Sequence, residues 1–139
     1  MTLQYSDEVR NQRLDTVETV IGAAPILELR SGSAPATCAT ADSGTLVCSI
    51  TLPSDWLAAA SSGVKAKAGT WSGTGSVAAG GGTNVGHFRI KNAGSPNTTG
   101  MQGTVTATGG GGDLTLDNIS VATSQAVTIT SFQITGGNA

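Results

Sequence analysis

The chain has 139 residues and a formal net charge of −2, and only 12% of its residues are charged. Gly, Ala, Ser and Thr fill more than half of the positions, and the chain holds one His and two Cys. Catalysis needs titratable groups placed against one another, whereas the acidic residues here are scattered along the sequence. The few Lys and Arg residues are too dispersed to displace the counterions of a nucleic acid. The composition therefore argues against an enzyme, a cofactor or metal site, and direct nucleic-acid binding.

Length and apolar content indicate one small domain with a thin core. A chain of 139 residues fits a single domain, and Ile, Leu, Val and Phe fill about a fifth of it. Such a domain gains stability by burying surface against a partner, so we expect a homodimer, another homo-oligomer or docking on a different protein. The most apolar run, residues 21–29, is far shorter than the roughly 20 apolar residues of a membrane span. We therefore expect no membrane contact.

The start of the chain does not have the pattern of a secretory signal, because Asp7 and Glu8 lie where the apolar run should begin. The sequence therefore predicts synthesis in a cytoplasm. In that reducing compartment we expect Cys38 and Cys48 to be free thiols. A disulfide across the turn-rich stretch that they flank is the alternative.

The first 22 residues predict a helix. Ser6 is a suitable N-cap, Asp7 and Glu8 suit the positive end of the helix dipole, and Gly22 provides the stop. Arg10 and Arg13 fall within its apolar face. The residues that share this face at 100° per residue are Leu3, Val9, Leu14, Val17, Val20 and Ile21. Two interpretations stay open: a helix packed on its own domain, or an arm that docks on a partner, whose carboxylates the two arginines would meet.

From residue 26 onward the period changes from helical to two, which predicts short strands separated by Gly, Ser, Asn and Pro. On one of these strands Phe88 and Ile90 alternate with Arg89 and Lys91, so we expect a buried face and a solvated or partner-facing one. The fold class expected is mainly β: an antiparallel β-sandwich of jelly-roll or Ig-like type, residues 25–139, behind a helical arm, residues 1–24. The strands are expected at 26–30, 45–52, 64–71, 76–79, 85–91, 101–107, 113–116, 119–121 and 126–135.

Three other features have a structural and a functional interpretation. Residues 53–60 predict one helical turn that tucks Trp56 and Leu57 over the end of the sandwich. Trp71 is the one aromatic residue expected to be exposed, which would suit a sugar-binding platform. His87 would be a catalytic base only beside a nucleophile and an orienting acid, and its place on the charged strand face argues against that role.

Several segments, taken in order, resemble the capsid cement (decoration) proteins of tailed bacteriophages, most closely those of Bordetella phages. The segments are LRSGSAP at 29–35, GTL at 44–46, ITLP at 50–53, GHFRI at 86–90, QGTV at 102–105, DLTLDN at 113–118 and TSF at 130–132. They are strand and turn patterns, and their order over nearly the whole chain from residue 26 is what carries the resemblance. It implies a jelly-roll-like virion protein outside the capsid shell that bridges neighbouring major capsid proteins, often as a dimer. It transfers no catalytic or ligand residues.

The sequence thus predicts a non-enzymatic structural protein, made in the cytoplasm of a bacterial host, that cements the exterior of a phage capsid. A neck, tail or fibre component with a receptor-binding or sugar-binding sandwich is the alternative. Contacts to the major capsid protein are expected on the helix and on the charged strand face. The residues expected to make them are Val9, Arg10, Arg13, Val17, Arg89 and Lys91.

Overall fold

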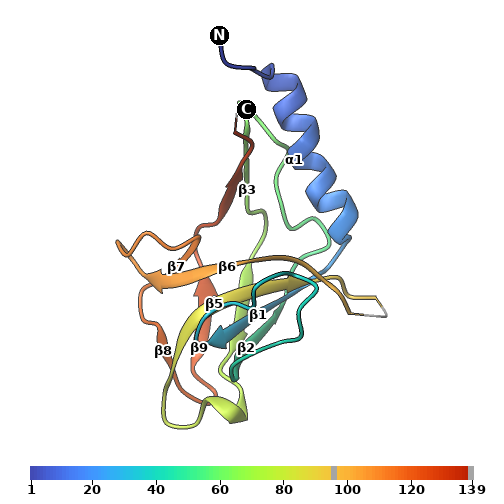
Figure 1. The fold of residues 1–139 in the computed structure, drawn as a ribbon. Helices are drawn as coiled ribbons and strands as arrows, with labels where there is room; N and C mark the ends of the chain where they lie inside the picture. Colours follow the sequence, from blue (N-terminus) through green and yellow to red (C-terminus); the bar gives the residue numbers. More distant parts are fainter. Residues whose placement is uncertain (95–96, 138–139) are drawn as a thin grey trace.

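The computed structural model describes residues 1–94 and 97–137, so positions 95–96 and 138–139 of the predicted β-domain lie outside the described residues (Figure 1). A single helix, α1, precedes a series of short strands, and a 3₁₀ turn, η1, interrupts them. Their bounds are α1 Asp7–Ile21, β1 Ile26–Ser31, β2 Leu46–Thr51, β3 Val64–Ala66, β4 Trp71–Thr74, η1 Val77–Ala79, β5 Thr83–Lys91, β6 Thr99–Ala107, β7 Leu114–Leu116, β8 Ser120–Val121, β9 Ala126–Ile129 and β10 Gln133–Thr135. The prediction of a mainly β chain with an N-terminal helix is confirmed.

Helix α1 begins and ends where its capping residues predict. The side chain of Ser6 accepts a hydrogen bond from the backbone N–H of Val9 at 3.3 Å, which satisfies one of the unpaired donors of the first turn. Gly22 ends the helix with a positive φ of 91°, a conformation that glycine adopts without a steric penalty.

The main sheet has the strand order β2-β1-β5-β6-β7, and the short β8 pairs with the start of β5. Neighbouring strands are antiparallel except β6 and β7, which run parallel. The sheet is therefore mixed, and the expectation of a purely antiparallel architecture is wrong at this edge. Strand β5 lies between β1 and β6, and its residues 87–91 are buried on both faces of the sheet.

Two further antiparallel ladders, β4–β9 and β3–β10, complete the β structure. The predicted strand 64–71 is split into β3 and β4, and the predicted strand 126–135 is split into β9 and β10. The first break is at Gly69, whose φ is +67° and whose added Cβ would lie 2.7 Å from Pro53. Across the second break the buried positions change phase, from Val127 and Ile129 to Phe132, so one continuous strand does not fit residues 126–135.

Two other local predictions are wrong in conformation. Residues 76–79 are not a strand, because Val77–Ala79 forms the 3₁₀ turn η1. The stretch 53–60 contains no helical turn. Its packing was nonetheless anticipated correctly, since Trp56 is 0% and Leu57 is 1% exposed.

The core contains a chain of aromatic side chains. Trp71 lies 6.1 Å from Trp56 and 5.4 Å from Phe132, measured between ring centroids, and Phe132 meets Phe88 edge-on at 5.8 Å. Trp71 is 0% exposed and its indole N–H donates to the Ala68 carbonyl. The expectation that Trp71 is exposed is therefore wrong, and a sugar platform on this ring is not present in the fold.

Candidate interaction surfaces

One face of α1 is fixed to the β-domain by a buried cation. The Lys65 ammonium of β3 lies 2.7 Å from Asp15 and 2.9 Å from Glu18, both on α1, and its side chain is only 3% exposed. Burial alone would lower the pKa of Lys65, but hydrogen bonds and charge from Asp15 and Glu18 outweigh it and raise the pKa. The ammonium therefore stays charged and holds the helix.

Polar contacts continue along the same face of α1. Arg10 donates through Nε to the Gly136 carbonyl at 2.6 Å, and Asn11 accepts from the Gly63 N–H at 2.8 Å. Beyond the end of the helix, the Trp56 indole N–H donates to the Gly22 carbonyl at 3.1 Å. The interpretation of a helix packed on its own domain is thus correct for this face, and Arg10 belongs to it.

The adjacent face of α1 is open. Val9, Arg13, Val17 and Val20 follow one another at spacings of four, four and three residues, which aligns them in one outer stripe. Val9 is 43% and Val20 is 75% exposed, whereas Val17 is partly buried against the core. The hollow of about 260 Å³ beside the stripe is mostly apolar, and its lining residues are Arg13, Thr16, Val17, Val20, Ile21 and Gly100. The outer stripe is therefore apolar surface with one cation in it.

The second predicted contact face, on β5, is covered rather than exposed. Arg89 is 1% and Lys91 is 6% exposed. The connection between β1 and β2, residues 32–45, lies over them and is called the strap. Arg89 donates to the carbonyls of Thr37, Cys38 and Thr40 in the strap, and its guanidinium lies 2.6 Å from Asp42. The expectation of a solvated charged face is wrong, because alternation along a strand does not reveal what covers it.

The strap is held by a network of charges on the outer face of the sheet. The Asp42 carboxylate lies 3.1 Å from Arg30 and 2.5 Å from Lys91, in addition to its contact with Arg89. On the sheet itself, the Glu28 carboxylate lies 2.7 Å from Arg30 and 3.0 Å from Lys91. Three cations therefore share two carboxylates, and Asp42 is the member that links the strap to the sheet.

Acid should loosen the strap through Asp42. Burial would raise the pKa of Asp42, but hydrogen bonds from Lys91 and Arg89 and the charge of Arg30 outweigh it and hold the pKa below its usual range. An unfolded Asp has a pKa of about 3.9. Because the folded-state pKa is lower, this stabilisation is complete above that value and is lost as the pH falls through the folded-state pKa.

We therefore expect Asp42→Asn to reduce the loss of stability that acid causes below about pH 4. Urea unfolding of the variant and the wild type at a series of pH values measures this slope. Asp55→Asn is the matched control, because Asp55 is exposed and forms no ion pair among the described residues. An equal acid slope in the wild type and Asp42→Asn would contradict the assignment.

The strap also encloses the single histidine. His87 is 0% exposed and its Nδ1 lies 2.9 Å from the Gly32 carbonyl, while Gln102 donates to the Pro35 carbonyl at 2.7 Å. Gly86 allows this close passage, since an added Cβ would lie 2.3 Å from the Gly32 oxygen. His87 thus contacts the strap. Among the described residues, no pair of a nucleophile and an orienting acid is hydrogen-bonded to it.

Both cysteines are free, as predicted. Cys48 is buried on β2, and burial raises the pKa of its thiol to about 11. Cys38 lies in the strap and is partly exposed. The two thiols therefore differ in accessibility, which the sequence alone did not distinguish.

Sequence reasoning missed the carboxylates that organise both surfaces. Asp42 lies in a stretch without regular structure, and Asp15 and Glu18 look like ordinary exposed helix residues. Their only signal in the sequence is a negative charge that could pair with a cation. The cations they pair with in the structure are Arg89, Lys91 and Lys65. The partners became evident only when the strap and α1 were placed on the sheet.

Within the described part of the chain, no group of three or more His, Cys, Asp or Glu side chains is arranged to hold a metal ion. Among the same residues no helix is long and apolar enough to cross a membrane. Comparisons with protein-family models, with characterised proteins and with solved structures find no match to this chain.

Proposed function

We propose that this chain is a non-enzymatic structural protein of a tailed-phage virion, which binds the outside of the capsid shell and bridges neighbouring major capsid proteins. The observation that supports this best is the outer stripe of α1, because it leaves Val9 and Val20 exposed beside Arg13 on a helix that is otherwise fixed to its domain. A rigid apolar stripe with one cation suits a protein partner that offers apolar groups and a carboxylate. The proposed class of partner, a major capsid protein, is taken from the resemblance of the ordered strand and turn segments to cement proteins.

The jelly-roll-like sandwich is part of the same proposal. The main sheet curls so that the β4–β9 ladder lies beside β2, where Cys48 forms an isolated bridge with Gly75 (Figure 1). Two layers of strands around one apolar core are what a sandwich requires. The mixed pairing at β7 would then be a local variation at one edge.

Binding to many equivalent sites explains how such a protein would act. Each copy that bridges two subunits adds its binding free energy to the work of separating them. Modest affinity at each site is therefore sufficient to raise the temperature at which a shell comes apart. This mechanism does not require Arg89 or Lys91 to contact the partner. Both are buried and form contacts within the fold.

The test is co-sedimentation of the purified chain with capsid shells assembled without it. We expect saturable binding that raises the temperature of shell disruption. Val20→Asp should weaken binding by about tenfold or more, because an apolar contact worth roughly 1.5 kcal/mol is replaced by a charge. Point substitution is preferred to removal of α1, since Leu14 and Ile21 of the helix are part of the buried interior.

Val77→Asp is the matched control, because Val77 is 88% exposed on η1, away from the outer stripe. Both variants should keep the wild-type urea midpoint, as exposed substitutions usually change stability by less than about 0.5 kcal/mol. Equal loss of binding in both variants would remove the outer stripe from the proposal. Absence of wild-type binding together with a stable trimer in solution would favour a neck, tail or fibre component.

A further inference from the structure

Three polar atoms on the outer face of the sheet are buried and have no hydrogen-bond partner among the described residues. They are Nε2 of His87, Nε of Arg89 and Oε1 of Gln102. Buried polar atoms are nearly always paired, because an unpaired one keeps the full free-energy cost of losing its hydration. The direct contacts between the strap and the sheet therefore do not account for all the polar groups that these contacts bury.

The three side chains are neighbours beneath the strap. His87 and Arg89 are two positions apart on β5, so both project from the same face of the sheet. Gln102 lies directly opposite Arg89 in the register of β5 and β6, so it projects from that face as well. Each of the three also donates to at least one backbone carbonyl of the strap. The unpaired atoms therefore belong to one polar layer between the sheet and the strap.

The bonds to the strap determine which unpaired atoms donate and which accept. A carbonyl oxygen only accepts, so Nδ1 of His87 carries the hydrogen that it shares with Gly32, and Nε2 is an acceptor in the neutral ring. By the same argument the Gln102 amide nitrogen faces Pro35, so its unpaired oxygen is an acceptor. The Nε–H of Arg89 is a donor. The layer therefore contains one unpaired donor and two unpaired acceptors.

This set of atoms selects the ligand. Direct pairing of Arg89 with either acceptor would leave the other acceptor unpaired, whereas one water molecule accepts from Arg89 and donates to both His87 and Gln102. Three hydrogen bonds are typical of a buried water. A metal cation would face the guanidinium charge, and an anion would face two acceptors. We propose that an internal water bridges His87, Arg89 and Gln102 and is part of the attachment of the strap to the sheet. This inference is independent of shell binding.

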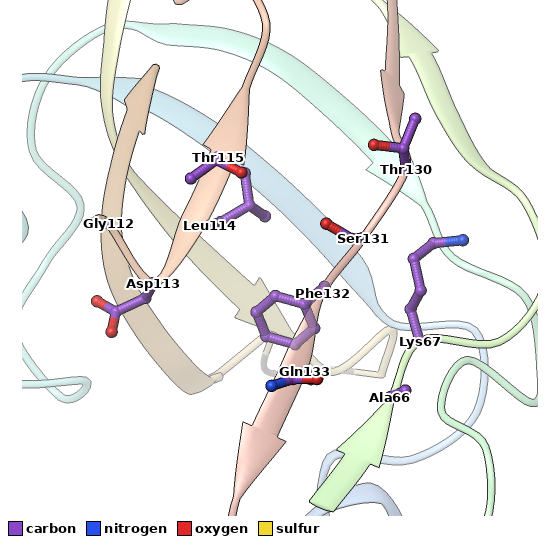
Figure 2. A pocket seen from close by; sticks show the side chains of 10 residues that line it. All are labelled: Ala66, Lys67, Gly112, Asp113, Leu114, Thr115, Thr130, Ser131, Phe132 and Gln133. Atoms are coloured by element: carbon purple, nitrogen blue, oxygen red, sulfur yellow. The ribbon is translucent and has the colours of Figure 1, made fainter. Parts of the chain in front are cut away.

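A second glutamine provides the contrast between bulk and internal water. Gln133 is exposed and lines an open hollow of about 510 Å³ between residues 112–115 and residues 130–133, so bulk water solvates its amide (Figure 2). The unpaired oxygen of Gln102 is closed off from solvent. A water bound to it would therefore exchange with the bulk only when the strap opens locally.

Nuclear Overhauser spectroscopy of the wild-type protein tests the proposal. The two carbon-bound ring protons of His87 flank Nε2 and do not exchange with solvent during the measurement, so their cross-peaks with water report proximity. We expect both protons to give such cross-peaks, with the sign of a long-lived bound water. The ring protons of Trp56 are the internal control, because Trp56 is also fully buried and its N–H already donates to Gly22. A His87 signal no stronger than that of Trp56 would overturn the proposal.

Substitution of Gln102 tests the ligands of the water. Gln102→Met should remove most of the His87 cross-peak, because it deletes one of the three hydrogen bonds that hold the water. Gln133→Met is the matched control, and it should leave the cross-peak at its wild-type intensity. An unchanged cross-peak in Gln102→Met would overturn the assignment. Nitrogen chemical shifts that place the hydrogen of the neutral His87 ring on Nε2 would overturn it as well, because Nε2 would then be a donor.

Discussion

Replacing Arg89 by Met is expected to lower the free energy of unfolding by about 3 kcal/mol. The guanidinium is 1% exposed, and it donates to three strap carbonyls and to Asp42. Met has a similar length and no donors, so the carbonyls lose their partner while the packing volume is largely kept. The loss should therefore come from released polar groups rather than from a cavity.

Urea unfolding measures the loss, and hydrogen exchange shows where it acts. We expect the amides of residues 36–42 to exchange faster in Arg89→Met than in the wild type, because this arginine holds that part of the strap. Arg13→Met is the matched control, since Arg13 is exposed on the outer stripe and contacts only the Tyr5 ring among the interactions described, at 5.0 Å. Wild-type stability in Arg89→Met, or a control equally destabilised, would contradict a structural role for the buried guanidinium.

Replacing Trp71 by Ala should cost about 3–5 kcal/mol of unfolding free energy. The ring is fully buried between Trp56 and Phe132, and it joins β4 to the segment between β9 and β10. Its removal deletes contacts with both neighbours and leaves a cavity that the short strands around it cannot close. Domains of this size typically have only about 5–15 kcal/mol of total stability, so the variant should be close to unfolding.

Fluorescence of the remaining Trp56 during urea unfolding reports the stability of the Trp71→Ala variant. Trp71→Phe is the control, because it keeps an aromatic ring at the same position and should lose clearly less stability than Ala. Equal effects of Ala and Phe would mean that the indole N–H, which donates to the Ala68 carbonyl at 3.0 Å, matters more than the volume of the ring.

Local signals in the sequence were sufficient for some elements and insufficient for others. Ser6 and Gly22 marked the ends of α1 correctly, because capping depends on residues that are neighbours in the chain. Alternation located β1, β2 and β5 and identified Phe88 and Ile90 as core residues. It also predicted one continuous strand over 64–71, whereas the chain breaks at Gly69, whose φ is +67° and where an added Cβ would lie 2.7 Å from Pro53.

The candidate surfaces were predictable only in part. The helical period placed Val9 and Val20 on one face of α1, and both are exposed in the structure. The same period also placed Leu14 and Ile21 there, and these two are buried against the β-domain. The burial of Arg89 could not be foreseen, because the strap that covers it has no large apolar residue and no periodic pattern.

The hydrogen bond between Arg10 and the Gly136 carbonyl joins residues that are 126 positions apart in the chain. During synthesis, α1 leaves the ribosome before β10 does. The helix can therefore form early but cannot complete its docking until Gly136 has been translated. Such dependence on distant contacts favours slow folding, on the scale of milliseconds to seconds, with the apolar residues of the helix accessible to other molecules in the interval.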